Sequence, residues 1–151
     1  MKIAVFAGSF DPFTLGHYDI VMQASSLFDL LIIGIGNNDN KKYMFTWQQR
    51  SLYIKKVFEN VDKISVQPYN GLTVDFCKKL NATYILRGLR TNADFEYEKN
   101  IAQNNAILNP DLTTVFMIAA FDKNHISSTI VRDILRNNGN ANHLLPLPFE
   151  L

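Results

Sequence analysis

Residues 2–17 read KIAVFAGSFDPFTLGH, and this stretch decides the fold. Lys2 to Ala7 form a short, almost continuous apolar run, which predicts a buried strand. Gly8 to Gly16 are rich in residues that favour turns. Apolar residues then recur with the spacing of an amphipathic helix, at Ile20, Val21, Ala24, Leu27 and Phe28. The stretch therefore predicts a strand that turns sharply into a helix beginning near His17.

The same alternation continues along the chain. Apolar runs of strand length predict further strands at 30–35, 64–66, 83–86 and 114–119. Helices are expected from the cap Thr46 to about Glu59, from Gly71 to about Leu80, from Ala93 to just before Asn109-Pro110, and from Ser127 to Gly139. This pattern predicts an α/β fold, a single domain over 1–151, with a five-stranded parallel sheet and helices on both faces. Ligands of such sheets bind beyond the carboxyl ends of the strands.

Composition restricts the function and the location. Of the 151 residues, 47% are hydrophobic and 19% are charged, as in soluble globular proteins, and the formal net charge is +1. This balance gives no general attraction to nucleic acid or to a membrane, so neither is expected as a partner. Cys77 is the only cysteine, which excludes an intrachain disulfide, and its apolar neighbours predict a buried, inert thiol. With no signal-peptide pattern and no apolar run of membrane-spanning length, a cytoplasmic location is expected.

The turn and helix start at 8–17 have the chemistry of a phosphate site. Glycines allow close backbone approach, and a helix N-terminus offers unpaired N–H groups to an anion. Ser9 adds a hydroxyl and His17 an imidazole. The alternative is an ordinary turn with a capping histidine, but the combination of Gly-Ser-Phe-Asp-Pro with Gly-His favours a ligand site. The stretch matches neither a P-loop nor a G-x-G-x-x-G motif.

Cations and hydroxyls follow other predicted strands. Lys41 and Lys42 follow the second strand, Arg87-Gly88-Leu89-Arg90 the fourth, and residues 123–129 (KNHISST) the fifth. Each could be a solvated surface segment or a helix cap. Their shared position beyond strand ends instead predicts phosphate clamps, among them one of the two lysines, because guanidinium groups and helix starts bind phosphate oxygens well.

The chain resembles the nucleotidyltransferase superfamily, whose signature ends in Gly-His, and within it the bacterial phosphopantetheine adenylyltransferases. The resemblance runs in order along nearly the whole chain. It rests on residues 8–17 (GSFDPFTLGH), 41–46 (KKYMFT), 87–90 (RGLR), 94–98 (DFEYE) and 126–129 (ISST). It implies a Rossmann-like nucleotidyltransferase fold and transfer of the adenylyl group of ATP to 4'-phosphopantetheine, giving dephospho-coenzyme A and pyrophosphate.

The resemblance also implies roles for individual residues. Catalysis falls to His17, which stabilises the transition state, with Lys41, Arg87 and Arg90. The acceptor is bound by Ser9, Lys41, Thr73 and Arg87. ATP is bound by Ser9, Phe10, His17, Gly88, Leu89, Arg90, Glu98, Lys123, Asn124, His125, Ile126, Ser127, Ser128 and Thr129. No protein metal site is expected. Mg²⁺ is expected to bind through ATP phosphates and water, and a homohexamer and feedback by coenzyme A are expected.

Alternatives and departures from the family pattern remain. Nicotinate-mononucleotide adenylyltransferases share parts of these motifs but usually carry a histidine where this chain has Thr14. A cytidylyltransferase, or a non-catalytic nucleotide-binding protein, is a further alternative. Ser9 stands where many relatives have threonine, and Asn124-His125 replaces more aromatic residues, which is expected to alter adenine packing. Residues 145–151 (LPLPFEL) stand where relatives commonly continue into further helix, which leaves the packing of that end open.

Overall fold

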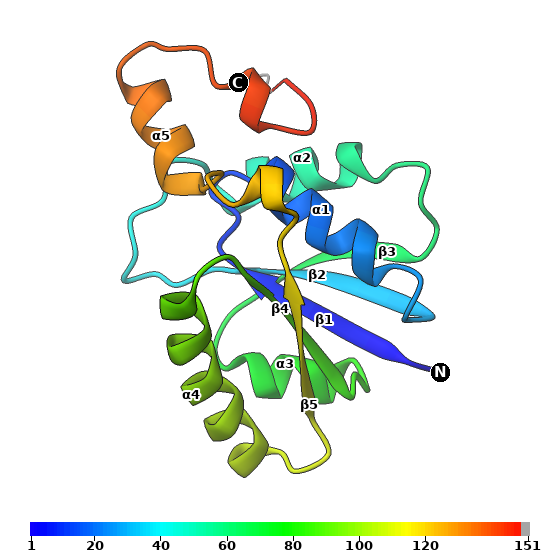
Figure 1. Cartoon of the computed structure of the whole chain (residues 1–151). Helices are drawn as coiled ribbons and strands as arrows, with labels where there is room; N and C mark the ends of the chain where they lie inside the picture. The colour runs from blue at the N-terminus through cyan, green and yellow to red at the C-terminus, as the bar shows by residue number, and fades with distance from the viewer. Residues whose placement is uncertain (149–151) are drawn as a thin grey trace.

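A computed structural model describes residues 1–148 of the chain. Over this range, five parallel strands form one sheet in the order β3-β2-β1-β4-β5 (Figure 1). The strands are β1 (Ile3–Gly8), β2 (Leu30–Gly36), β3 (Ile64–Tyr69), β4 (Tyr84–Leu89) and β5 (Thr113–Ile118). The predicted parallel α/β fold is confirmed, and residues 149–151 of the predicted domain lie outside the described range.

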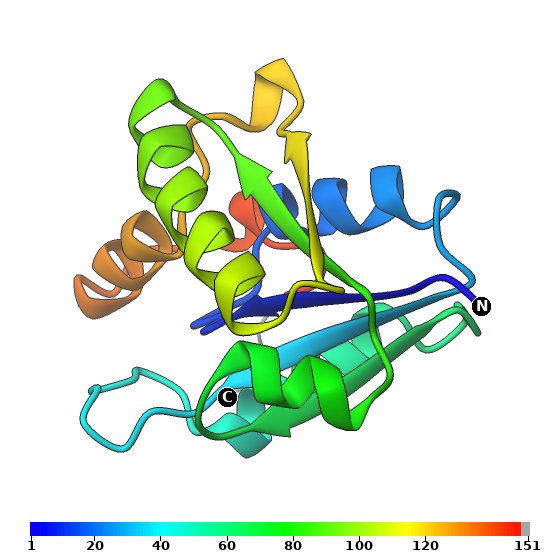
Figure 2. The ribbon, with the colours of Figure 1, turned by 90° about the horizontal axis from the view of Figure 1, so that it is seen from below.

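Helices cover both faces of this sheet. They are α1 (Leu15–Ala24), α2 (Trp47–Val57), α3 (Thr73–Lys79), α4 (Asn92–Leu108) and α5 (Ser128–Arg136), with 3₁₀ turns η1 (Phe121–Lys123) and η2 (Asn142–Leu144). α1 and α2 lie on one face, and α3 and α4 on the other (Figures 1 and 2). The strand order reverses between β1 and β4, and ligands of open α/β sheets bind at such a switch point.

The helix starts are fixed by side chains that the sequence supplies. Thr46 caps α2 and Ser127 caps α5, both as predicted. Thr14 caps α1 and Thr91 caps α4, each in a reciprocal capping box with the residue three positions later. An N-cap of this kind typically contributes about 1 kcal/mol, so these contacts define where each helix begins.

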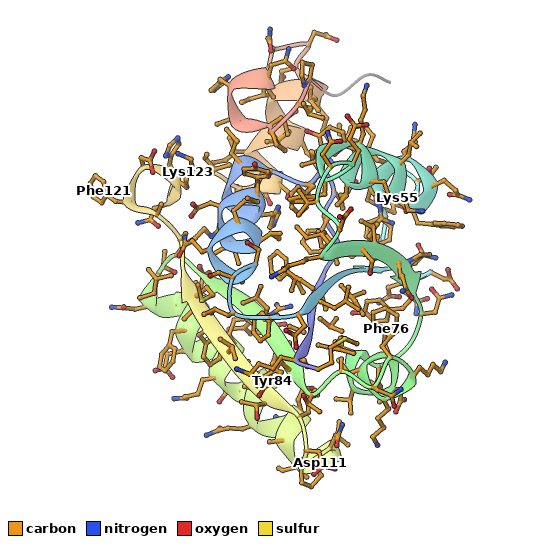
Figure 3. All side chains as sticks on the ribbon, turned by 90° about the vertical axis from the view of Figure 1, so that its right-hand side faces the viewer. Lys55, Phe76, Tyr84, Asp111, Phe121 and Lys123 are labelled. Atoms are coloured by element: carbon orange, nitrogen blue, oxygen red, sulfur yellow. The ribbon has the colours of Figure 1, made fainter. Side chains whose placement is uncertain are left out.

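Alternating residues of β1 fill a hydrophobic core on each face of the sheet. Ala4 and Phe6 belong to the cluster under α1 and α2, whereas Ile3, Val5 and Ala7 belong to the cluster under α3. Cys77 is buried in the second cluster, as predicted, and burial raises the pKa of its thiol to about 11. Phe76 packs on the same face (Figure 3). Each large aliphatic or aromatic side chain buried in this way contributes roughly 1.5–3 kcal/mol.

Strands β3 and β4 are longer than the sequence predicts. β3 continues beyond Val66 to Tyr69, and it tolerates Pro68 because it is the edge strand of the sheet. β4 continues to Leu89, so Arg87 lies inside the strand rather than after it. The parallel pairing of Arg87 with Phe116 extends the ladder, and an ion pair described below satisfies the arginine.

No helix within residues 1–148 combines the length and apolarity needed to cross a bilayer.

Candidate functional site

The loop after β1 forms a rigid floor for the site. Phe10 has a φ of 48°, a left-handed conformation that costs about 1–3 kcal/mol for a residue of this size. Its buried ring packs 5.1 Å from the His17 ring and 5.4 Å from that of Phe13, measured between centroids. A Cβ at Gly8 would lie 2.9 Å from the Phe10 ring, so only glycine fits there. Packing thus holds the loop in a shape that the backbone alone disfavours.

His17 lies in the first turn of α1, beside the end of β1. The backbone N–H of Thr14 donates a hydrogen bond to Nδ1 of His17 over 3.0 Å. Because Nδ1 accepts this bond, Nε2 carries the proton of the neutral ring. Burial, with the nearby charges of Arg90 and Arg87, lowers the pKa of His17 to about 4. The imidazole is therefore a neutral N–H donor at pH 7.

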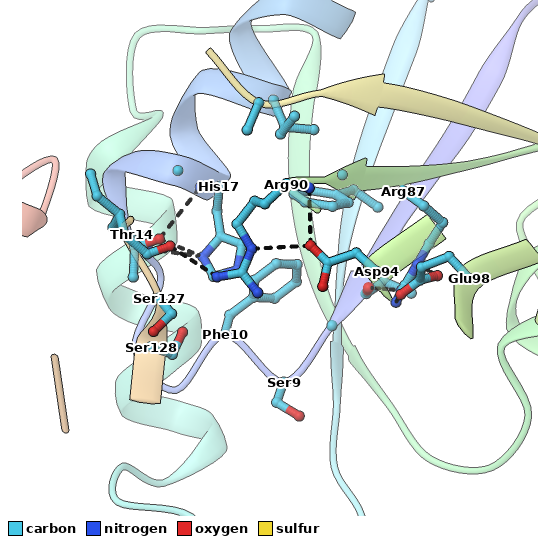
Figure 4. A pocket seen from close by; sticks show the side chains of 18 of the residues that line it. Ser9, Phe10, Thr14, His17, Arg87, Arg90, Asp94, Glu98, Ser127 and Ser128 are labelled. Atoms are coloured by element: carbon cyan, nitrogen blue, oxygen red, sulfur yellow. Dashed lines mark hydrogen bonds and ion pairs between the residues drawn. The ribbon is translucent and has the colours of Figure 1, made fainter. Parts of the chain in front are cut away.

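A cavity of about 330 Å³ opens beside this imidazole at the carboxyl ends of β1 and β4 (Figure 4). We call it the His17 cavity. Its polar lining comes from the loop after β1, the end of β4, α4 and the start of α5, and its apolar lining includes Ile20 and Ala119. Predicted site residues that line it are Ser9, Phe10, His17, Arg87, Gly88, Arg90, Glu98, Ile126, Ser127, Ser128 and Thr129.

Arg87 is held by a two-pronged ion pair with Glu98 of α4. Nε of Arg87 lies 2.6 Å from Oε2 of Glu98, and Nη2 lies 2.5 Å from Oε1. Nη1 of Arg87 donates to the carbonyl of Ala7 over 2.6 Å. Glu98 is only 8% exposed, so the pair is shielded on the carboxylate side. Both carboxylate oxygens of Glu98 are bonded to Arg87. The contact of Glu98 with ATP stays a prediction.

Arg90 is held by a second carboxylate. Its backbone N–H donates to Oδ2 of Asp94 over 2.9 Å, and its Nη1 donates to the carbonyl of Ile126 over 3.2 Å. Asp94 was predicted only as part of the 94–98 motif, with no role of its own, yet this side chain joins the capping box of α4 to Arg90. Arg90 thereby links α4 to the segment that precedes α5.

The start of α5 is tied to the loop after β1. Ser128 Oγ donates to the carbonyl of Pro12 over 2.8 Å, and Arg132 Nη1 donates to that of Asp11 over 2.7 Å. Ser127, Ser128 and Thr129, at the start of α5, thus line the His17 cavity beside this loop.

Four predicted ATP contacts lie apart from this lining. Lys123, Asn124, His125 and Leu89 are not among the residues that line the His17 cavity over the described range. Lys123 pairs with Asp122 on η1, and the exposed ring of Phe121 projects from the same turn away from the sheet (Figure 3). For residues 123–125 the unpredicted turn η1 accounts for this, because it carries the segment outward before Ile126 returns to the core, whereas Leu89 is the last residue of β4.

A second cavity, of about 540 Å³, adjoins the first. We call it the Lys41 cavity. It is lined by Ser9, Lys41, Thr73 and Arg87, all predicted to bind the acceptor, and Nζ of Lys41 donates to Oγ of Ser9 over 3.1 Å. The two cavities share Ala7, Gly8, Ser9 and Arg87. Groups able to bind phosphate from separate stretches of chain therefore meet at one rim of the sheet.

Part of the Lys41 cavity was not predicted from the sequence. It is also lined by residues 37–40, Tyr43 and Tyr69. Tyr43 directly follows the two lysines, so its place in the motif was a usable signal. Tyr69 was missed because the predicted third strand ended at Val66. Its hydroxyl lies 2.8 Å from Oγ1 of Thr73, and its ring stacks on Phe76, which makes it a fixed wall.

The described residues contain no group of three or more His, Cys, Asp or Glu side chains placed to hold a metal ion. The carboxylates of Asp94 and Glu98, which line the His17 cavity, are engaged by Arg90 and Arg87.

The chain is similar to known proteins over nearly its whole length. Residues 5–134 match the family described as Cytidylyltransferase-like. A phosphopantetheine adenylyltransferase of Christiangramia forsetii is 49% identical over 97% of this chain and 96% of its own length. That of Flavobacterium psychrophilum is 51% identical with the same coverage, and that of Limosilactobacillus reuteri is 40% identical over 97% of this chain and 84% of its own length.

Among solved structures, a bifunctional NMN adenylyltransferase/ADP ribose pyrophosphatase from Francisella tularensis has a TM-score of 0.74. It is 19% identical to this chain, and the match covers 96% of this chain and 45% of that one. At this identity the likeness supports the fold alone.

Proposed function

Because this chain belongs to the phosphopantetheine adenylyltransferase family of cytidylyltransferase-like proteins, we propose that its two adjoining cavities divide the two substrates of that reaction. The enzyme transfers the adenylyl group of ATP to 4'-phosphopantetheine, giving dephospho-coenzyme A and pyrophosphate. ATP occupies the His17 cavity, and the phosphate of the acceptor enters the Lys41 cavity. The observation that supports this division is the shared rim formed by Ser9 and Arg87.

The chemistry needs little beyond placement and charge. An oxygen of the acceptor phosphate attacks the α-phosphorus of ATP, the bond from that phosphorus to the bridging oxygen breaks, and pyrophosphate leaves. The nucleophile is already an anion, so no strong base is required. Positioning and electrostatic stabilisation supply most of the rate in such phosphoryl chemistry.

His17 is proposed to stabilise the α-phosphate. Thr14 orients the neutral ring so that its Nε2 carries the proton. This N–H group can donate a hydrogen bond to the negative charge that develops on the α-phosphate. Arg90 and the start of α5 at 127–129 line the same cavity, and they are proposed to hold the β- and γ-phosphates. Mg²⁺, bound through phosphates and water, neutralises charge on the triphosphate.

Lys41 and Arg87 are proposed to hold the acceptor phosphate. The ammonium of Lys41 already contacts Ser9 at the shared rim. Arg87 lines both cavities, and Glu98 fixes its orientation. Two cations beside the attacking oxygen offset the repulsion between two polyanionic substrates. Thr73 lies farther along the same cavity, where the pantetheine arm would pass.

Assembly and regulation are further parts of the proposal. The surface formed by α4, β5 and η1 exposes large apolar side chains, which favours burial between copies of the chain as a homohexamer. They are Phe95, Tyr97, Ile107, Leu108, Ile118 and Phe121. Light scattering after size exclusion should give six times the 17.2 kDa of the chain. Coenzyme A, which shares its groups with the product, would inhibit by occupying the same cavities, and a cytoplasmic location fits this biosynthetic role.

A substrate panel tests the function. Pyrophosphate release is measured with ATP or CTP as donor and with 4'-phosphopantetheine or nicotinate mononucleotide as acceptor. Of the four combinations, we expect rapid pyrophosphate release only from ATP with 4'-phosphopantetheine. Thr14, which takes the place of a second histidine, caps α1 and orients His17 rather than contributing another imidazole. Preference for nicotinate mononucleotide, or for CTP, would overturn the assignment.

A further inference from the structure

Arg50 of α2 is a charged side chain in the protein interior that lines neither of these cavities. It is 1% exposed, and it is one of the largest fully buried side chains of the described range. Its Nε donates to the carbonyl of Phe45 over 3.1 Å. Its Nη1 donates to the carbonyl of Ser9 over 2.5 Å and lies 3.3 Å from that of Gly36. Arg50 therefore joins the loop after β1, the end of β2 and the segment that leads into α2.

The ring of Tyr43 lies against this guanidinium. The Cζ atom of Arg50 is 4.1 Å from the ring centroid, and the Nζ atom of Lys41 is 5.7 Å from it. Both distances are within the range of cation–π attraction. The hydroxyl of Tyr43 accepts a hydrogen bond from the backbone N–H of Asn38 over 3.0 Å and donates to the carbonyl of Gly36 over 3.4 Å. Tyr43 thus closes the loop from which Lys41 projects.

Asp11 completes this arrangement from the loop after β1. Its carboxylate accepts the backbone N–H groups of Met44 and Phe45 over 2.8 and 2.9 Å. Burial lowers the pKa of Arg50, and the charge of Asp11 opposes that shift. A buried cation is tolerated only with such partners, so the lysine loop is fixed at its base to the same turn that carries Ser9.

Lys41 itself needs such support. Its side chain is exposed, and an ammonium on a four-carbon stem is flexible in solution. At the shared rim, however, its ammonium must meet the acceptor phosphate in one geometry. The rate depends strongly on the position of such a group, since a displacement of about 1 Å can lower the rate about 100-fold.

We propose that Tyr43 and Arg50 are positioning residues that hold the Lys41 ammonium over Ser9 for the acceptor phosphate. The inference rests on the proposed role of Lys41. It differs from a purely structural role, in which loss of Tyr43 would lower stability or weaken both substrates alike. A positioning role predicts that Tyr43 matters only while Lys41 is present.

A double-mutant cycle tests this dependence. The variants are Tyr43→Leu, Lys41→Met and the pair together, each assayed for kcat and for the KM of both substrates. Tyr43→Leu should lower kcat/KM for 4'-phosphopantetheine by about tenfold, a fraction of the loss expected for full misplacement. The KM for ATP should not change. In the Lys41→Met background, Tyr43→Leu should change kcat/KM by less than about twofold, the limit set by additivity of independent sites.

Matched variants separate the contributions of the Tyr43 hydroxyl, the Arg50 guanidinium and the neighbouring lysine. Tyr43→Phe keeps the ring but removes the hydroxyl bonds to the loop, and it should retain more activity than Tyr43→Leu. Arg50→Lys keeps the charge but cannot bridge the three segments. It should lower kcat/KM for 4'-phosphopantetheine and leave the KM for ATP unchanged. Lys42→Met removes the neighbouring lysine, which is not among the residues that line either cavity over residues 1–148, and it should resemble wild type. Thermal unfolding of each variant identifies loss of fold.

These variants test the role of Lys41 separately from the positioning role of Tyr43. If Lys41→Met is as active as wild type, the proposed role of Lys41 is wrong, and the positioning role falls with it. If Lys41→Met is impaired but Tyr43→Leu has its full effect in that background, Lys41 keeps its role and the positioning role of Tyr43 is refuted.

Discussion

The backbone N–H of Thr14 lies 3.0 Å from Nδ1 of His17, and the same threonine caps the helix that carries the histidine. The contact fixes the tautomer, because an accepting Nδ1 leaves the proton on Nε2. The helix cap and the proposed transition-state donor are therefore one structural unit.

The imidazole of His17 should stay neutral well below pH 6. Its pKa is lowered to about 4 by burial and by Arg90 and Arg87. We expect a ¹⁵N NMR titration to give a midpoint near pH 4 and to show Nδ1 unprotonated above it, with the signal assigned through a His17→Gln variant. A midpoint above pH 6, or a proton on Nδ1, would contradict the proposed donor.

The same shift should make stability depend on pH. In the unfolded chain a histidine binds a proton below about pH 6.5, whereas folded His17 does so only near pH 4. The unfolded state thus holds more protons between these values, so the free energy of unfolding should fall as pH falls from 6.5 to 4, by at most about 3 kcal/mol from this group. Urea unfolding should show that the free energy of unfolding falls less between pH 6.5 and 4 for His17→Gln than for wild type. Equal falls in the two proteins would refute the lowered pKa of His17.

Loss of the imidazole should affect turnover far more than the fold. His17→Ala should lower kcat by about 10²–10³, the usual cost of removing one oxyanion donor. Circular dichroism should remain like that of wild type, because the Thr14 hydroxyl still caps α1. Steady-state pyrophosphate release gives the rate, and activity close to that of wild type would exclude His17 from the chemistry.

Arg87 should matter more for the acceptor than for ATP. Arg87→Met should raise the KM for 4'-phosphopantetheine by about 10- to 100-fold, the range for losing charge-assisted hydrogen bonds. It also leaves the buried carboxylate of Glu98 unpaired, which can cost several kcal/mol of stability. The double variant Arg87→Met with Glu98→Gln should regain stability without regaining acceptor binding. Equal effects on both substrates would argue against the role.

The fold and the identity of the site followed from local patterns in the sequence. Apolar runs marked the core of each strand, and Thr46 and Ser127 marked helix starts correctly. The glycines, His17, Lys41 and Arg87 were recognised because they lie at or near strand ends, where an α/β sheet gathers its ligand groups.

The parts that escaped prediction depend on contacts between distant segments. Glu98 was expected to contact ATP from the family resemblance alone, and no local pattern shows that it pairs with Arg87 or that Asp94 pairs with Arg90. The pairing with β5 that carries Arg87 into the strand is likewise invisible to local pattern. Turn η1 was not predicted either, and Lys123 on this turn pairs with Asp122 and is not among the residues that line the His17 cavity.

Direct transfer between two adjoining cavities is the central claim, and the stereochemistry at the α-phosphorus tests it most directly. The reaction would be run with ATP that carries sulfur in one configuration at the α-phosphate, and the configuration of the dephospho-coenzyme A product would be determined. Attack from the Lys41 cavity, with pyrophosphate leaving on the opposite side, predicts inversion. Retention of configuration would require a covalent adenylyl intermediate on the protein and would contradict the arrangement around Ser9 and Arg87.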